Sequence, residues 1–264
     1  MRVLVAMFVA ACATGSALPR PPSPPRTTSL GIDLSGFNLG NGLRVVFVHD
    51  PHATEVQVTT RYRVGVVDEP DDQRGIAHLV EHLMFEQIIG QETIFARLQN
   101  IATSFNAFTT VDATSYFERA LPSHLGELLA IEAVRIGLRC TSVSQSAFER
   151  EREVVINELR MKDTATVVRH DVFAGLYTTG HPYRKLAADT EASVRAITRE
   201  QACAFADAHY APGNAVMVVS GNLDPTAVAK ALEKYVMRVP ARATAAAVQV
   251  QPIAPIARDV KITS

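Results

Sequence analysis

The sequence predicts an α+β fold, and three observations support this prediction. β-branched runs typical of strands recur early, in the middle and late in the chain. Stretches with the helical spacing of apolar residues separate these runs. The proportions of hydrophobic residues (47%) and charged residues (20%) are ordinary for a globular protein. A chain of 264 residues can bury one large core or two modest ones.

The expected elements follow in order along the chain. A β-branched run at 43–50 follows Asn41-Gly42, and a second run at 55–65 predicts a neighbouring strand. The Thr-, Phe- and Tyr-rich segment 104–120 predicts another strand pair, and 214–221 predicts a buried strand. Helices are expected at 74–88, 92–101, 123–139, 146–162, 166–177, 193–208 and from Pro225 to about Met237.

The charge balance argues against one class of function. The chain has 26 basic and 27 acidic side chains and a net charge of −1. A dedicated nucleic-acid binder normally has a surplus of basic residues. We therefore expect no nucleic-acid partner.

Residues 1–18 predict a signal peptide rather than a part of the fold. A short positive start precedes the apolar run Val3–Ala11, which is too short to span a membrane. The run ends at Cys12 and resembles a bacterial lipobox, so a lipidated Cys12 would attach the protein to a membrane. Two alternatives stay open, ordinary cleavage within 13–17 and the apolar N-terminus of a cytosolic protein. Either form of the signal predicts export, to the bacterial periplasm or as an envelope-anchored lipoprotein.

Composition divides the rest of the chain into three segments. Residues 19–30 are Pro-rich and predict an extended spacer. Residues 31–239 hold all the strongly periodic segments and predict one folded domain. Residues 240–264 are rich in Ala and Pro, which is typical of a linker or of the start of a second domain that is missing here.

Two cysteines remain if Cys12 is removed or lipidated. Cys140 and Cys203 could pair in an oxidising compartment or lie apart as buried thiols, and their spacing does not decide between these states. Both lie on stretches that predict amphipathic helix, so buried thiols are the favoured expectation.

The segment His78-Leu79-Val80-Glu81-His82 has the pattern H-x-x-E-H and predicts a metal site. Two histidines four residues apart lie on one face of a helix, where both rings can reach the same ion. Glu81 can face the open coordination position, where a water would bind. Imidazole and carboxylate ligands suit Zn²⁺, and they do not exclude Mn²⁺ or Co²⁺. The alternative is a solvated helix face without a metal.

A catalytic zinc site needs a third protein ligand from another element. The helix expected at 146–162 offers Glu151 and Glu158, which are two turns apart on one face, while Val154, Val155 and Leu159 supply an apolar face. One glutamate would be a ligand and the other its support. From these residues alone, a solvated glutamate-rich helix remains the commoner alternative.

Several blocks of the sequence resemble the pitrilysin and insulysin family of inverted zincins. That family pairs H-x-x-E-H with a later glutamate at the spacing that separates His82 from Glu158 here, and EREVVINE is similar to the family's second metal helix. Similar blocks are LGNGLRVVFV, the RVGVVDEP approach to the metal helix, FNAFTTVDATSY, GHPY and YAPGNAVMVVSGNLDP. Together they cover about residues 38 to 225 in the family's order.

The resemblance implies a fold and a function. The fold would be a mixed, largely antiparallel sheet covered by helices, as in one half of a pitrilysin-like metallopeptidase. The activity would be zinc-dependent hydrolysis of peptide bonds in extended or unfolded peptides. One zinc ion per chain would bind His78, His82 and Glu158, with Glu81 as the general base.

The resemblance also implies roles for three residues around this centre. Glu151 would support the metal site without binding the ion. Asn106 and Ala107 would lie on the strand against which family members place the substrate backbone. A turn residue at the start of a strand is the alternative for Asn106.

The sequence departs from the family in one respect. Family members have two homologous halves, and the second carries an Arg and Tyr motif that nothing in this sequence matches. We therefore expect a fragment, a truncated product, or a catalytic half that needs a second half or subunit. The alternative functions are a non-catalytic pitrilysin-like partner that binds peptides or a catalytic subunit, and a metal-binding protein without hydrolysis. The retained Glu81 argues against both.

Overall fold

The fold was analysed in a computed structural model of the chain. The structure describes residues 26–27, 33–137, 140–161, 168, 170–172, 175–177, 180–187, 189–246 and 248. The predicted signal peptide, most of the spacer, part of the helix expected at 166–177 and most of the segment 240–264 lie outside the described residues. No helix in the described part of the chain has the length and apolar character needed to cross a membrane.

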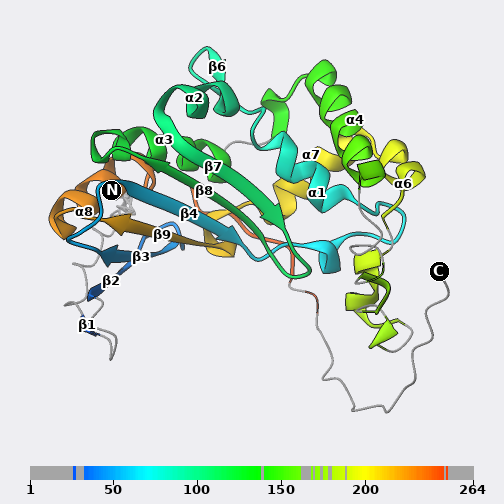
Figure 1. Ribbon diagram of the computed structural model, residues 1–264, viewed down its shortest axis with the longest axis horizontal. Helices are drawn as coiled ribbons and strands as arrows, with labels where there is room; N and C mark the ends of the chain where they lie inside the picture. Colours follow the sequence, from blue (N-terminus) through cyan, green and yellow to red (C-terminus); the bar gives the residue numbers. More distant parts are fainter. Residues whose placement is uncertain are drawn as a thin grey trace, which may run out of the picture.

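A mixed, largely antiparallel sheet forms the centre of the described chain (Figure 1). Its strand order is β1-β2-β3-β9-β4-β8-β7, and β3 with β9 is the parallel pair. A separate small hairpin pairs β5 with β6. The strands are β1 (Arg26–Thr27), β2 (Asp33–Asn38), β3 (Arg44–His49), β4 (Val56–Tyr62), β5 (Ile88–Ile89), β6 (Glu92–Thr93), β7 (Ala102–Thr109), β8 (Thr114–Ala120) and β9 (Ala215–Gly221).

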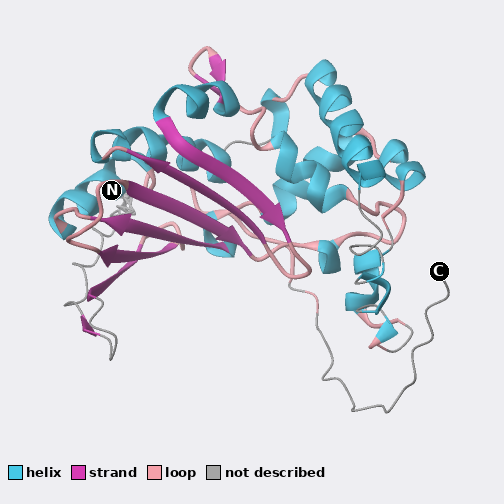
Figure 2. Ribbon diagram, viewed as in Figure 1, coloured by secondary structure: helices cyan, strands magenta, loops and turns pink. Residues whose placement is uncertain are grey.

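The helices gather on one side of the sheet and beyond one of its ends (Figure 2). The α-helices are α1 (Ile76–Leu83), α2 (Ile94–Ile101), α3 (Leu125–Gly137), α4 (Gln145–Met161), α6 (Glu191–Ala196), α7 (Arg199–His209) and α8 (Pro225–Tyr235). Short 3₁₀ helices are η1 (Val66–Asp68), η2 (Pro122–His124), η3 (Cys140–Ser142), η4 (Pro182–Ala187) and η5 (Pro212–Asn214). This arrangement confirms the predicted fold class.

The main core lies between the sheet and these helices. In β4, Val56, Val58, Thr60 and Tyr62 are buried, while the residues between them are partly or fully exposed. This alternation places one face of the strand against the helices, since successive side chains of a strand point to opposite faces. The core therefore anchors the strands on which part of the functional site is built.

The predicted pairing of the first two long strands is wrong. The runs at 43–50 and 55–65 do form β3 and β4, but β9 lies between them, parallel to β3 and antiparallel to β4. The residues of β9 that face the helices, Met217 and Val219, are fully buried. The apolar pattern of a strand near the end of the chain predicts that the strand is buried, but it does not predict which strands it pairs with.

The helix expected at 193–208 is two helices. α6 ends before Ile197, and α7 starts after Thr198. The Thr198 hydroxyl accepts a hydrogen bond from the Gln201 amide, and the Gln201 side chain accepts one from the Thr198 amide. This reciprocal capping box starts a new helix where the apolar period alone suggested a continuous one.

Cys140 and Cys203 form a disulfide, which corrects the expectation of two separate thiols. Their Cα atoms are 4.9 Å apart. Cys140 lies in η3 rather than in a helix, and this turn brings it beside α7, which carries Cys203. The disulfide thus ties the turn before α4 to α7, and both of these helices contact α1.

Candidate active site

Helix α1 presents two different faces. Ile76, Leu79, Val80 and Leu83 are fully buried against the core, so His78 and His82 lie on the opposite, accessible side. The buried Glu69 caps the helix, because its carboxylate accepts hydrogen bonds from the amides of Gly75 (3.1 Å) and Ala77 (3.0 Å). Burial outweighs these two donors and raises the pKa of Glu69 to about 7. The cap fixes the first turn, from which His78 projects.

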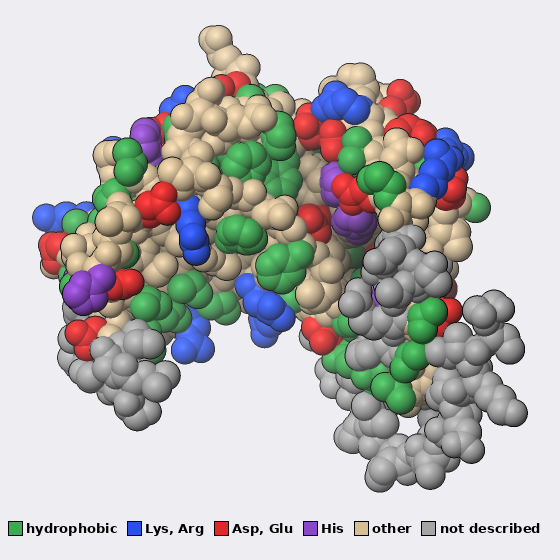
Figure 3. All heavy atoms as spheres, in the orientation of Figure 1, with side chains coloured by type: hydrophobic (Ala, Val, Ile, Leu, Met, Phe, Trp, Pro, Cys, Tyr) green, Lys and Arg blue, Asp and Glu red, His purple; other side chains and the backbone are tan. Residues whose placement is uncertain are grey.

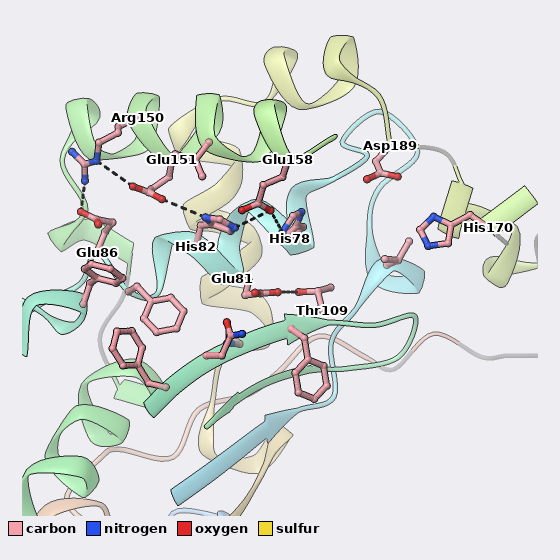
Figure 4. A pocket seen from close by; sticks show the side chains of 18 residues that line it. His78, Glu81, His82, Glu86, Thr109, Arg150, Glu151, Glu158, His170 and Asp189 are labelled. Atoms are coloured by element: carbon pink, nitrogen blue, oxygen red, sulfur yellow. Dashed lines mark hydrogen bonds and ion pairs between the residues drawn. The ribbon is translucent and has the colours of Figure 1, made fainter. Parts of the chain in front are cut away.

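His78, His82 and Glu158 converge from two helices (Figure 4). The Glu158 Oε2 atom lies 3.4 Å from His78 Nε2 and 3.7 Å from His82 Nε2. Ligand atoms bound at about 2.0–2.1 Å to a tetrahedral ion lie about 3.4 Å apart. The two distances to Glu158 approach this value, and all three ligand atoms lie within 4.8 Å of one another, so the set could hold a zinc ion. The structure brings the predicted ligand set together.

Glu151 contacts the back of the same site. Its Oε2 atom lies 3.3 Å from His82 Nδ1, which leaves His82 Nε2 on the side of Glu158. Glu151 also bonds Arg150 (3.1 Å), which in turn bonds Glu86 beyond the end of α1 (2.5 Å). Burial alone would raise the pKa of Glu151, but the hydrogen bond from His82 and the charges of His82 and Arg150 lower it.

Glu81 lies beneath the two histidine rings and is nearly buried. The Thr109 hydroxyl at the end of β7 donates a hydrogen bond of 2.5 Å to Glu81 Oε2. Burial raises the pKa of Glu81, and the Thr109 hydrogen bond and the nearby histidines oppose that rise. A carboxyl group with a raised pKa beside a metal site is suited to take up a proton.

The pKa of His82 depends on the acidic side chains around it. Burial alone would lower its pKa, but the hydrogen bond to Glu151 and the negative charges of Glu158 and Glu81 raise it. The negative charge of this cluster thus favours a cation between the side chains.

β7 is the edge strand beside this centre, and it carries the predicted substrate residues. Asn106 is exposed, and Ala107 is nearly buried. The Ala107 amide donates a hydrogen bond of 2.9 Å to the side-chain Oδ1 of Asn106. Asn106 therefore lies within the strand rather than in a turn at its start.

A cavity of about 1010 Å³ joins the metal ligands to the edge strand. Its lining includes Glu81, Asn106, Arg150, and the aromatic side chains of Phe85, Phe95 and Phe105. The centroids of these three rings lie 5.6 to 6.5 Å apart. In Figure 3, histidine and acidic side chains gather at a hollow whose neighbouring surface carries hydrophobic side chains. The cavity has an ionic end and an aromatic end.

The sequence reasoning missed several residues of this cavity. Thr109 donates a hydrogen bond to Glu81. His170 and Asp189 line the far side of the cavity (Figure 4). Thr109 belongs to the block FNAFTTVDATSY, so its place in that block was the available signal. His170 and Asp189 had no such signal, because no ligand-like spacing connects them to the H-x-x-E-H segment.

Comparisons with known proteins identify the family of the chain. Residues 44–190 match the profile of the family described as Insulinase (Peptidase family M16), and residues 196–263 match the one described as Peptidase M16 inactive domain. Subunit beta of the mitochondrial-processing peptidase of Neurospora crassa is 26% identical over 218 residues, which are 81% of this chain and 45% of that protein. An uncharacterized zinc protease of Mycobacterium leprae is 32% identical over 189 residues, which are 70% of this chain and 42% of that protein.

Solved structures show the same fold. The first half of the periplasmic protease PqqL from Escherichia coli superposes with a TM-score of 0.73 at 21% identity, covering 88% of this chain and 50% of that one. A protease from Helicobacter pylori gives a TM-score of 0.72 at 24% identity, covering 83% of this chain and 53% of that one. The chain spans about half of each of these matched chains, and the PqqL chain is itself the first half of that protein. It belongs to the insulinase family of peptidases, family M16.

Proposed function

We propose that the chain is the catalytic half of a zinc metalloendopeptidase that hydrolyses peptide bonds in extended or unfolded peptides. The observation that carries this proposal is the convergence of His78, His82 and Glu158 directly above Glu81. Two imidazoles and one carboxylate are the ligand set of several catalytic zinc sites, which keep a fourth position open.

Each residue of the centre has a distinct task in this proposal. His78, His82 and Glu158 would hold the ion, which when bound lowers the pKa of a water and polarises the scissile carbonyl group. Glu81 would accept a proton from the attacking water and pass it to the leaving amine. Glu151 would keep the Nδ1 proton of His82 in place, which leaves Nε2 free for the ion.

The edge strand supports an extended substrate. An unpaired sheet edge can bind a peptide backbone as an added strand. The Ala107 amide already has an acceptor in the Asn106 side chain, and a peptide carbonyl could take the place of that side chain. The aromatic end of the cavity, at Phe85, Phe95 and Phe105, would bind an apolar side chain of the peptide.

Replacement of the base tests the proposed activity. Glu81→Gln should abolish cleavage of an unstructured, internally quenched peptide, measured with the chain in excess, while zinc stays near one ion per chain. Glu153→Gln is the matched control, because Glu153 is an exposed α4 glutamate paired with Arg195. If wild type and Glu81→Gln cleave at equal rates, the chain is not this enzyme and the scaffold alternative gains support.

A second half or subunit is part of the same proposal. The relatives include a beta subunit of a mitochondrial-processing peptidase, of which this chain spans 45%. The chain also spans 50% of the solved first half of PqqL. A single half leaves the site open to solvent, which weakens substrate positioning. The chain alone should cleave weakly, and a family second half with an Arg and Tyr motif should raise the rate. Fast turnover by the isolated chain would contradict this expectation.

We also propose that the protein is exported. The disulfide between Cys140 and Cys203 supports this proposal, since disulfides persist in oxidising compartments. Attachment to a membrane through a lipidated Cys12 is the proposed mode of anchoring. Cys12→Ser should then move the protein from the membrane fraction to the soluble fraction, and an unchanged membrane association would exclude this anchor.

A further inference from the structure

We infer that Thr109 is a positioning residue for Glu81 and that the β7–β8 hairpin is locked so that its hydroxyl can serve this role. This inference rests on the proposed function, in which Glu81 is the general base. It concerns the orientation of the carboxylate rather than the identity of the base.

The contact between the two side chains is direct and short. Thr109 Oγ1 lies 2.5 Å from Glu81 Oε2 and carries one hydroxyl hydrogen. The second neighbour of this hydroxyl, Thr114 Oγ1, is 3.3 Å away. An ionised carboxylate at the shorter distance is the stronger acceptor. The hydroxyl hydrogen of Thr109 is therefore directed at Glu81.

Thr114 keeps this arrangement from changing. Thr114 is fully buried and lies directly opposite Thr109 in the register of β7 and β8. Its own hydroxyl donates to the carbonyl of Val64 at 2.9 Å. Because that hydrogen is in use, Thr114 does not donate to Thr109 or to Glu81. As an acceptor it is farther from Thr109 than Glu81 is and carries no charge, so the Thr109 hydrogen stays on Glu81.

The tip of the hairpin is held by the chain just before α1. The amides of Val66 and Val67 donate to the carbonyls of Thr110 (3.2 Å) and Val111 (3.0 Å). A Cβ atom at Gly65 would lie 2.4 Å from the Thr110 carbonyl oxygen, so this approach depends on glycine. The hairpin tip therefore has a fixed position relative to Val64 and to the start of the metal helix.

A fixed orientation of the carboxylate matters more for a glutamate that acts as a general base than for a glutamate on the surface. A free glutamate side chain has several rotamers, and fixing them costs entropy that the Thr109 hydrogen bond offsets. Small misplacements of a catalytic group can lower a rate by two orders of magnitude. With Oε2 held by Thr109 in the cavity wall, the carboxylate has a defined orientation beneath the two histidines.

The test combines kinetics with a double-mutant cycle on the zinc-loaded chain. Thr109→Val removes the hydroxyl at nearly constant volume and should lower kcat by about ten- to hundredfold, with KM and zinc content unchanged. Thr109→Ser should restore most of the rate. Thr103→Val is the matched control on the same strand, because the Thr103 hydroxyl donates to the Arg119 carbonyl rather than to Glu81.

The cycle separates this inference from the proposed function. Thr109→Val should lower the free energy of unfolding more in the chain with Glu81 than in the chain with Glu81→Ala. If the stabilities show this coupling but the wild-type chain cleaves no peptide, the contact between Thr109 and Glu81 is supported and the proposed peptidase activity is not. Additive stabilities, or a Thr109→Val variant as fast as wild type, would overturn the inference.

Discussion

His82 uses its two ring nitrogens for different purposes. Nδ1 faces Glu151 and Nε2 faces Glu158, so the carboxylate behind the ring determines which nitrogen is available to a metal. Glu151 lies outside the proposed ligand set, yet its contact favours the tautomer of His82 that leaves Nε2 for an ion. Residues of this kind often matter for metal affinity almost as much as the ligands do.

Glu151→Gln should weaken zinc binding by about tenfold, because an amide holds the Nδ1 proton less strongly than a carboxylate does. Competition with a chelator, followed for the wild-type and variant chains, measures the effect. Glu149→Gln is the matched control, since Glu149 is exposed on α4 and bonds Gln145. Equal zinc affinities would show that His82 does not depend on this hydrogen bond.

At the scale of elements, the helix α1 and the edge strand β7 are joined through a turn. The η1 segment binds the tip of the β7–β8 hairpin and leads into α1 through the capping residue Glu69. This path sets the distance between the edge strand and the helix that carries His78 and His82. Gly65 lies at its tightest point.

Gly65→Ala should lower the free energy of unfolding by about 1–3 kcal/mol, because its new methyl group would meet backbone carbonyls that cannot easily move. Urea denaturation measures this loss. Gly36→Ala is the control, since a Cβ there meets no atom within 4 Å. A Gly65→Ala chain as stable as the control would mean that the turn can relax.

The elements show how far sequence reasoning reached. The strands β3, β4, β7, β8 and β9 and the helices α1 and α4 were predictable, because their apolar periods are strong. The strand β2 and the β5–β6 hairpin were not predicted. The position of β9 in the sheet was not predictable, because the sequence of a buried strand does not indicate which strands lie beside it. The Cys140–Cys203 disulfide was missed because the helical period hid the turn at η3. Thr109 was visible only as one threonine among several.

For the whole molecule, the core contains an unusual charge cluster. Arg135, Glu118 and Glu132 are all fully buried, and Arg135 hydrogen-bonds both carboxylates. One cation cannot neutralise two buried carboxylates, so one of them should keep its proton. Burial, together with the charge of Glu132, raises the pKa of Glu118 to about 8.

This cluster predicts a pH dependence of stability. The folded chain holds a proton on Glu118 up to about pH 8, whereas the unfolded chain releases it near pH 4.5. Stability should therefore fall as the pH rises through that window. Glu118→Gln should reduce the difference in the free energy of unfolding between pH 5 and pH 8 by about a few kcal/mol. Urea denaturation at the two pH values measures this difference. Parallel profiles for the two chains would show that the carboxyl group is ionised in the fold.

The direct test of the whole account is the zinc content of the purified, folded chain, measured by mass spectrometry of the metal. We expect about one zinc ion per wild-type chain and almost none after His78→Gln combined with Glu158→Gln, with Glu153→Gln unchanged. A folded wild-type chain that takes up no zinc, or a double variant that keeps it, would contradict the proposed centre.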